Sequence, residues 1–271
     1  MSRRIVVILV IVAICGWSTM VQAQDSLSYN GSSTILKAVM YDAAKVFKKE
    51  QGVIFDLKGE STGFGIKKLL AGECDIAGGG RPLKDDERAK GLVETKAFLD
   101  AYAFIVNTSN PVTSITSGQI AEVMAGKIVA WDDLGGPAGK KIMILSPPEK
   151  SAHYKNAKKI IGFDKLPANS MMVDMTPNVS KKVKSFPVAI GWLSSANVVG
   201  SKDVKMLQIV HNGESVAVNQ ANLSSGKYPY QQTMYFYTMG EPSGKVKDFI
   251  DFIKGAQGQE IVTKAGFFLA E

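Results

Sequence analysis

Two short polar stretches of this sequence have the residue types needed to bind an anion. The first is Gly31-Ser32-Ser33-Thr34, and the second is Ser61-Thr62-Gly63-Phe64-Gly65. Each stands immediately before apolar residues at helical spacing, so each is predicted to cap a helix. A helix N-terminus offers unpaired N–H groups and about half a positive charge, which suits an oxyanion. The alternative for the second stretch is that its glycines only turn the chain.

A strand is predicted in front of each polar stretch, at residues 27–31 and 53–57, and a helix behind each. Repeated strand–turn–helix units favour an α/β fold with a largely parallel sheet. Ligands of such sheets collect at the carboxyl ends of the strands, where the helices begin. The two polar turns are therefore expected to lie near each other.

The rest of the chain continues the alternation of apolar strands and amphipathic helices. Further strands are predicted at residues 101–107, 141–145, 187–193, 204–210 and 234–237. Helices are predicted at 115–124 and 154–161, and a last helix begins at the cap Ser243 and ends at Gly255. We expect no internal repeat and no membrane-spanning segment after the N-terminus.

Residues 1–23 have the features of a secretory signal peptide. Arg3 and Arg4 precede an apolar run, and Val21-Gln22-Ala23 forms a small-residue site with cleavage expected after Ala23. This predicts a periplasmic protein; lipidation at Cys15 is disfavoured by the bulky residue before it. Cleavage lowers the formal net charge from +7 to +5, because the two arginines are the charged residues of the peptide. The remaining charges are dispersed, which argues against a nucleic-acid partner.

Signals for catalysis or for a bound metal are missing. The mature chain keeps a single cysteine, Cys74, so it forms no internal disulfide. Its two histidines, His153 and His211, do not have zinc-ligand spacing with it. The glycines of the second polar stretch, Gly63 and Gly65, match neither a dinucleotide-binding nor a phosphate-loop motif. We therefore expect no enzyme activity, no metal and no cofactor.

Several segments, taken in order, resemble the periplasmic phosphate-binding proteins of ABC transporters. They are GSST at 31–34, STGFGI at 61–66, CDIA at 74–77 with RPL at 81–83, AIGW at 189–192, YFYT at 235–238 and EPSGKV at 241–246. The resemblance implies two α/β lobes, each with a mixed, mainly parallel sheet, joined by two hinge strands near 103–107 and 204–210. Lobe 1 is expected to comprise residues 24–106 and 206–271, and lobe 2 residues 107–205.

The resemblance also implies a function and part of a site. It implies a monomer that captures phosphate or a related small oxyanion between its lobes and delivers it to an ABC permease. Matching residues in the first lobe are Ser33, Thr34 and the Ile35 N–H in the first loop, and Thr62 with Gly63 in the second. Neutral donors at helix N-termini bind oxyanions without burying a counter-charge.

Two positions depart from the family's pattern. Gly80 stands where the family commonly has an aspartate that accepts the proton of hydrogen phosphate, and Arg81 follows it. In the second lobe, Ser151-Ala152-His153 replaces Ser-Gly-Thr, and proline replaces an arginine before it. Without an acceptor at position 80, the filter against fully ionised oxyanions is expected to be lost. Arg81, His153 or Lys150 could supply positive charge instead.

Two other functions stay open at this point. The altered second-lobe turn is compatible with a sensory or interaction module that uses the same fold for another ligand and transports nothing. A hydrolase built on Ser151 and His153 is the weaker alternative, because residues two apart do not face each other on a helix.

Overall fold

The computed structural model describes residues 25–176, 178–198 and 200–270. The predicted signal peptide and its cleavage site lie outside these residues. The strands are β1 (Ser26–Ser32), β2 (Ile54–Glu60), β3 (Ile76–Gly79), β4 (Leu92–Asn107), β5 (Ser114–Thr116), β6 (Met143–Ser146), β7 (Ser170–Met172), β8 (Ala189–Ser194), β9 (Val204–Met206), β10 (Gln208–His211), β11 (Glu214–Val216), β12 (Gln231–Met239) and β13 (Phe268–Leu269).

The helices alternate with these strands along most of the chain. One continuous helix comprises α1 (Ser33–Ile35), η1 (Leu36–Met40) and α2 (Tyr41–Gln51). The others are α3 (Thr62–Leu70), α4 (Asp85–Arg88), α5 (Ser117–Met124), η2 (Trp131–Leu134), α6 (Ala152–Ala157) running into η3 (Lys158–Gly162), α7 (Asn178–Ser185), η4 (Ser195–Asn197), α8 (Gln220–Ser224), α9 (Gly244–Lys254) and α10 (Ala256–Lys264). No helix among the described residues is long and apolar enough to cross a bilayer.

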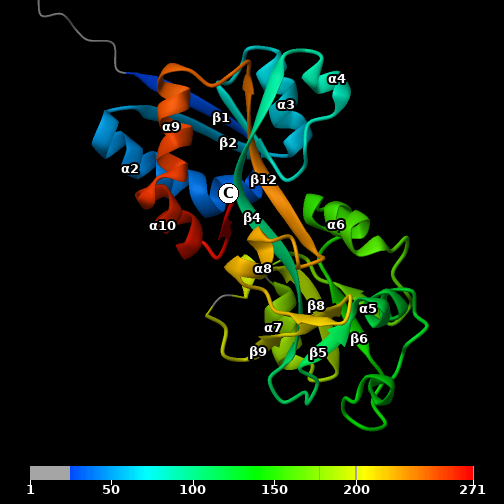
Figure 1. Cartoon of the computed structure of the whole chain (residues 1–271). Coiled ribbons are helices and arrows are strands. Elements are labelled where there is room, and N and C mark those ends of the chain that lie inside the picture. The colour runs from blue at the N-terminus through cyan, green and yellow to red at the C-terminus, as the bar shows by residue number, and fades with distance from the viewer. Residues whose placement is uncertain (1–24, 177, 199, 271) are drawn as a thin grey trace, which may run out of the picture.

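The molecule has two lobes that share one mixed sheet (Figure 1). Its strand order is β2-β1-β3-β12-β4-β8-β6-β7, and β9 and β13 also pair with β4. In this sheet β1 pairs parallel with β2 and β3, and β6 pairs parallel with β7 and β8. Strands β12 and β4 pair antiparallel with each other and with their other neighbours. The predicted two-lobed α/β fold with mixed sheets is confirmed.

Strand β4 is the structural link between the lobes. Its residues 92–101 pair with β12 in lobe 1, and residues 102–106 pair with β8 in lobe 2. Residues 97–106 of the strand are buried, as the middle of a sheet covered on both faces should be, whereas residues 93–96 are partly or fully exposed. Figure 1 shows β4 and β12 running side by side from the upper lobe into the lower one.

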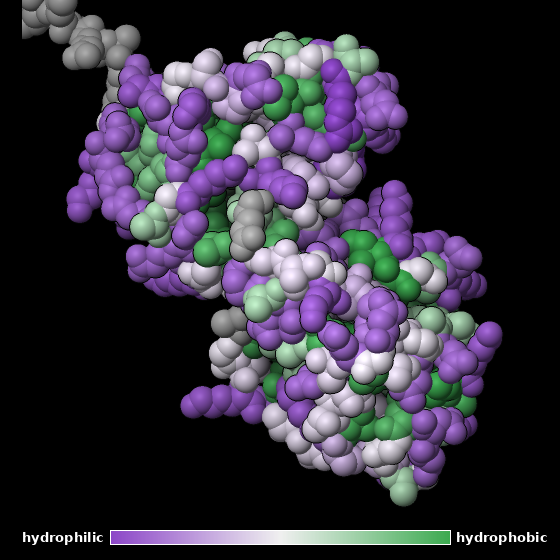
Figure 2. All heavy atoms as spheres, viewed as in Figure 1, coloured by the Kyte–Doolittle hydropathy of each residue, from purple (hydrophilic) through white to green (hydrophobic). Residues whose placement is uncertain are grey.

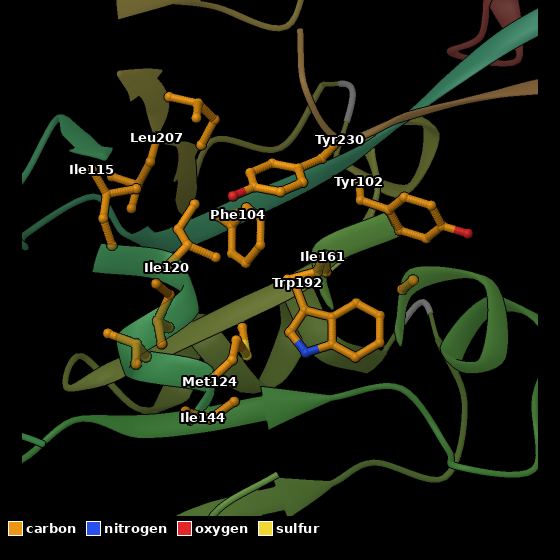
Figure 3. Packing of buried hydrophobic residues seen from close by; sticks show 14 of the residues in the cluster. Tyr102, Phe104, Ile115, Ile120, Met124, Ile144, Ile161, Trp192, Leu207 and Tyr230 are labelled. Atoms are coloured by element: carbon orange, nitrogen blue, oxygen red, sulfur yellow. The ribbon is translucent and has the colours of Figure 1, made fainter. Parts of the chain in front are cut away.

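Each lobe has its own apolar core. In lobe 1 the helix that begins at α1 packs with α9 and α10 on the sheet, around a cluster of aromatic rings that includes Phe47 and Phe249. In lobe 2 the largest fully buried side chains are Trp131 and Trp192, which belong to the core cluster of that lobe. Figure 3 shows Trp192 among residues of α5 and β6. Hydrophilic residues cover most of the face shown in Figure 2, and the two lobes are visible there as two masses joined at a narrower middle.

The return of the chain to lobe 1 bears on the predicted domain boundaries. Strand β10 pairs with β5, and Leu223 and Tyr228 pack into the lobe 2 core. Residues 206–228 therefore lie with lobe 2, although the sequence-based division assigned them to lobe 1. We propose that the return segment begins near Gln231, where β12 starts.

Local structure departs from the sequence-based expectation in three further places. The predicted helix at 115–124 starts at Ser117, because Thr116 ends β5 and caps α5 through its side chain. The predicted strand at 204–210 is two strands, β9 and β10, interrupted at Leu207. The helix predicted to be the last, α9, ends at Gly255 as expected but is followed by α10 and β13.

Candidate functional site: a cleft between the two lobes

A cleft of about 630 Å³ lies between the lobes and is lined by side chains from both. Lobe 1 contributes Ser32, Ser33, Thr34, Lys37, Ala38, Glu60, Ser61, Thr62, Gly80, Gln232, Met234, Ala265 and Phe267. Lobe 2 and the segment after β8 contribute Pro148, Ser151, His153, Asn156, Asp174, Met175, Thr176, Ser194, Ala196 and Asn197. A volume of this size is typical of small-molecule sites.

The N-terminus of α3 forms one part of the lobe 1 wall. Ser61 caps the helix, and its Oγ accepts a hydrogen bond from the Phe64 N–H at 3.3 Å. Glycine at position 65 lets the first turn lie directly on β1, because a Cβ there would be 2.6 Å from the Asn30 carbonyl oxygen. Thr62 packs over Gly79 in the same way, since a Cβ at 79 would be 2.2 Å from Thr62 Cγ2. The glycines therefore do more than turn the chain: they allow the N-terminus of α3 to lie close to β1 and β3 at the cleft.

The N-terminus of α1 forms the neighbouring part of that wall. Ser32 caps this helix and accepts a hydrogen bond from the Thr34 N–H at 3.2 Å. The Ser33 hydroxyl donates to the Glu60 carbonyl oxygen at 3.1 Å, which joins the first polar stretch to the end of β2. Lys37 follows one helical turn later and brings a cation to the cleft. Two helix N-termini therefore converge on one region, as the sequence predicted.

The facing wall is the start of α6 in lobe 2. Ser151 caps that helix: its Oγ accepts from the Tyr154 N–H at 3.0 Å and donates to the Pro148 carbonyl oxygen at 2.7 Å. The His153 ring stacks on Trp192, with ring centroids 6.0 Å apart, and lies 4.6 Å from the Tyr102 ring. Burial among these rings lowers the pKa of His153 to about 3, so the imidazole is neutral at physiological pH.

The base of the cleft combines residues that are distant in sequence. Gln232 on β12 accepts a hydrogen bond at Oε1 from the Tyr102 hydroxyl at 2.9 Å, and Asn156 Nδ2 lies 3.5 Å from the same oxygen. Gly80 borders this group, since a Cβ at that position would be 3.2 Å from Gln232 Oε1. Ser194, at the end of β8, completes the base.

The structure brings six of the nine predicted site residues to the cleft. These are Ser33, Thr34, Thr62, Gly80, Ser151 and His153. Three do not line it: Ile35 has its side chain in the lobe 1 core, Gly63 is exposed, and Arg81 points elsewhere. For Ile35 the prediction concerned the backbone N–H at the helix start.

Arg81 is held by a carboxylate outside the cleft. Its guanidinium donates to both carboxylate oxygens of Glu87, at 2.7 and 2.8 Å, and also to the Pro82 carbonyl oxygen. This pairing lowers the pKa of Glu87 to about 2. Lys150 is exposed and does not line the cleft either. The extra positive charge considered for Arg81, His153 and Lys150 is thus absent from the cleft walls, where Lys37 is accompanied by Glu60 and Asp174.

The geometry does not support nucleophilic catalysis by Ser151. Both hydrogen-bond partners of its hydroxyl are backbone groups, and His153 Nε2 is sealed from solvent with no hydrogen-bond partner. Within the described part of the chain, no group of three His, Cys, Asp or Glu side chains is placed to hold a metal ion. The arrangement suits reversible binding of a polar ligand.

Sequence reasoning missed several residues of the cleft. Lys37 could have been found, because it follows Ser33 and Thr34 at helical spacing and shares their face. Asn156, Ser194 and Gln232 carry no local signal, since their proximity depends on how β8, β12 and α6 meet at the hinge. Their positions follow from the topology and not from any motif.

These features define a two-lobed binding protein whose ligand site is the cleft between the lobes. The chain belongs to the PBP superfamily: that family's domain profile matches residues 19–256. The phosphate-binding protein PstS of Bacillus subtilis (strain 168) is 27% identical over 249 residues, which cover 91% of this chain and 81% of that protein. PstS of Borreliella burgdorferi is 25% identical and covers 91% of both chains.

Solved structures give the same relationship. A Clostridium perfringens protein described as a phosphate ABC transporter substrate-binding protein, with phosphate bound, is 27% identical with a TM-score of 0.74 over 91% of this chain and all of that one. An ABC-type phosphate transport receptor from Vibrio cholerae has a TM-score of 0.77 over 90% of this chain and all of that one, and its 20% identity makes it a match of fold.

Proposed function

We propose that this protein is a receptor that captures phosphate in the interlobe cleft for ABC-type import. The observation that carries the proposal is the convergence of the α1 and α3 N-termini on one wall of the cleft, opposite the start of α6. Helix N-termini bind oxyanions through backbone N–H groups and the helix dipole. The relatives named phosphate-binding proteins support the same ligand.

The side chains of the wall are suited to a small anion. Thr62 and Thr34 line the cleft, and their hydroxyl groups have no hydrogen-bond partner among the described residues. Lys37 adds one cation at the edge. Neutral donors of this kind hold an oxyanion without the desolvation cost of a buried counter-charge.

The remaining parts of the proposal concern partners and location. Delivery to a membrane permease is supported by the description of the Clostridium perfringens relative as an ABC transporter substrate-binding protein. A periplasmic location is supported by the predicted signal peptide. A monomer that closes its lobes by a hinge at β4 and β12 is sufficient for this role.

Calorimetric titration of the mature chain with inorganic phosphate tests the proposal. We expect a single site with micromolar affinity, and a melting temperature that rises with phosphate concentration by mass action. Sodium chloride at equal ionic strength is the control. No heat and no thermal shift at about 1 mM phosphate would rule out phosphate as the ligand and return the sensory or interaction role to first place.

A further inference from the structure

A carboxylate is buried beneath the base of the cleft. Asp100 lies in β4 and is completely inaccessible to solvent. Burial raises its pKa to about 6, and hydrogen bonds from Ser194 and Gln232 partly offset that effect. Asp100 does not itself line the cleft, but both of those partners do.

The hydrogen bonds around Asp100 have a definite direction. Oδ1 accepts from the Ser194 hydroxyl at 2.6 Å and from the Ala101 N–H at 2.8 Å, and Oδ2 accepts from Gln232 Nε2 at 3.1 Å. Every partner is a donor, as an ionised carboxylate requires. The Tyr102 hydroxyl, which Figure 3 shows turned away from the apolar cluster, donates to the other end of the Gln232 amide and fixes its orientation.

This direction determines what Ser194 can offer a ligand. A hydroxyl has a single hydrogen, and that of Ser194 is given to Asp100. The Ser194 oxygen can therefore only accept hydrogen bonds from a group in the cleft. Ser194 is thus a hydrogen-bond acceptor at the base of a site whose lobe 1 wall includes the hydroxyl donors Ser61 and Thr62.

The lobe 1 wall, by contrast, offers hydrogen-bond donors. The Ser61 oxygen accepts from the Phe64 N–H, which leaves its hydrogen available, and Thr62 has no hydrogen-bond partner among the described residues. These donors suit the unprotonated oxygens of an anion. An acceptor at the base is satisfied only by a ligand oxygen that carries a proton, because two facing lone pairs repel each other.

We propose that Asp100 is a positioning residue that makes Ser194 the acceptor for a protonated ligand oxygen, so that the cleft prefers a tetrahedral oxyanion bearing a hydroxyl, such as hydrogen phosphate, to a fully ionised one, such as sulfate. The proposal rests on the proposed function. Ser194, oriented by Asp100 of the hinge strand β4, supplies the acceptor that Gly80 does not provide.

The test is calorimetric titration with phosphate and with sulfate at about pH 8, where Asp100 is ionised. We expect the wild-type protein to bind phosphate at least about 100-fold more tightly than sulfate. Ser194→Ala removes the acceptor and should lower that ratio about tenfold or more, mainly by weakening phosphate. Ser146→Ala is the control, since Ser146 is a buried serine of lobe 2 that donates to the Pro147 carbonyl oxygen and does not line the cleft.

Asp100→Asn gives the independent readout. The amide adds donors and removes lone pairs, so either Ser194 or Gln232 must turn a donor toward the cleft. We expect sulfate to bind more tightly to this variant than to wild type, a gain that loss of structure cannot produce. If circular dichroism shows that this variant does not fold, Ser194→Ala decides alone.

Three outcomes separate this proposal from the function it rests on. A lowered ratio in the variants with an unchanged control supports it. Tight phosphate binding with an equal affinity for sulfate, or variants that keep the wild-type ratio, overturns it and leaves phosphate capture intact. Absence of binding by either anion to the wild-type protein overturns both.

Discussion

Glu87 holds the guanidinium of Arg81 by two hydrogen bonds, and neither residue lines the cleft. The carboxylate side chain is only 10% exposed and also accepts from the Lys84 N–H, so the pair fixes the segment between β3 and α4. Arg81 directly follows Gly80 at the cleft base. The Arg81 guanidinium therefore stabilises the segment between β3 and α4, and its charge is neutralised by Glu87.

Arg81→Gln should reduce stability and leave phosphate affinity unchanged. The substitution unpairs Glu87, at a cost of about 1–3 kcal/mol in the free energy of unfolding. The folded-state pKa of Glu87 is about 2, below its ordinary value of 4.5, so this stabilisation is present above about pH 4.5 and is lost as pH falls toward 2. Denaturant unfolding at pH 7 and at low pH measures it.

Lys58→Gln is the control for that experiment, because the Lys58–Asp56 pair is exposed on both sides. It should leave the free energy of unfolding nearly unchanged, because an exposed ion pair is screened by solvent. A tenfold loss of phosphate affinity in Arg81→Gln would show instead that the guanidinium reaches the ligand.

The two hydroxyl residues Thr62 and Ser33 should contribute unequally to ligand binding. Thr62 has no hydrogen-bond partner among the described residues, whereas the Ser33 hydroxyl is committed to the Glu60 carbonyl oxygen. Thr62→Val should weaken phosphate binding about tenfold or more, and Thr62→Ser should restore most of it. Ser33→Ala should change the affinity less than about threefold. Equal losses in calorimetry would mean that Ser33 exchanges its partner for the ligand.

Two glycines of α3 should respond in opposite ways to alanine. Gly65 lies against the backbone of β1, so Gly65→Ala should cost about 1–3 kcal/mol and displace the helix N-terminus, which weakens ligand binding. Gly63 has open space around it, so Gly63→Ala should be neutral or stabilise by up to about 1 kcal/mol. Chemical denaturation with and without phosphate measures both effects, and a matching loss in the two variants would contradict the close packing.

Much of the fold could be predicted from local sequence. Ser61 before an apolar helical run gave the α3 terminus, and Ser32 to Thr34 gave that of α1, because capping depends on residues close in the chain. Residues 206–228 could not be placed in this way, since the pairing of β10 with β5 joins segments about 90 residues apart and no local pattern encodes it.

The candidate site was partly predictable for the same reason. Thr62 and His153 lie at helix starts that the sequence marks, but the sequence does not reveal that burial leaves His153 uncharged or that Glu87 takes the charge of Arg81. Asp100 was the available signal, because a single acid within the buried apolar segment 97–106 implies a polar network. Its partners come from β8 and β12 and could be found only in three dimensions.

His153 should make the protein sensitive to mild acid. Its folded-state pKa is about 3, below the ordinary value of 6.5. Between these values the unfolded chain binds a proton that the folded protein does not, so stability falls as pH decreases from about 6.5 to about 3. Asp100 acts in the opposite sense, because its pKa of about 6 lies above the ordinary 3.8 and stability from this group increases as pH falls through that window.

Comparison with His153→Gln isolates the histidine, since Asp100 is present in both proteins. Relative to wild type, the variant should gain on the order of 5–10 °C in melting temperature between about pH 7 and about pH 4. Tyr154→Phe, which changes a neighbour without removing a group that titrates in this range, should follow the wild-type curve. Parallel curves for wild type and His153→Gln would show that the imidazole takes up protons in the folded state, and the cleft would then carry a positive charge in acid that it lacks at neutral pH.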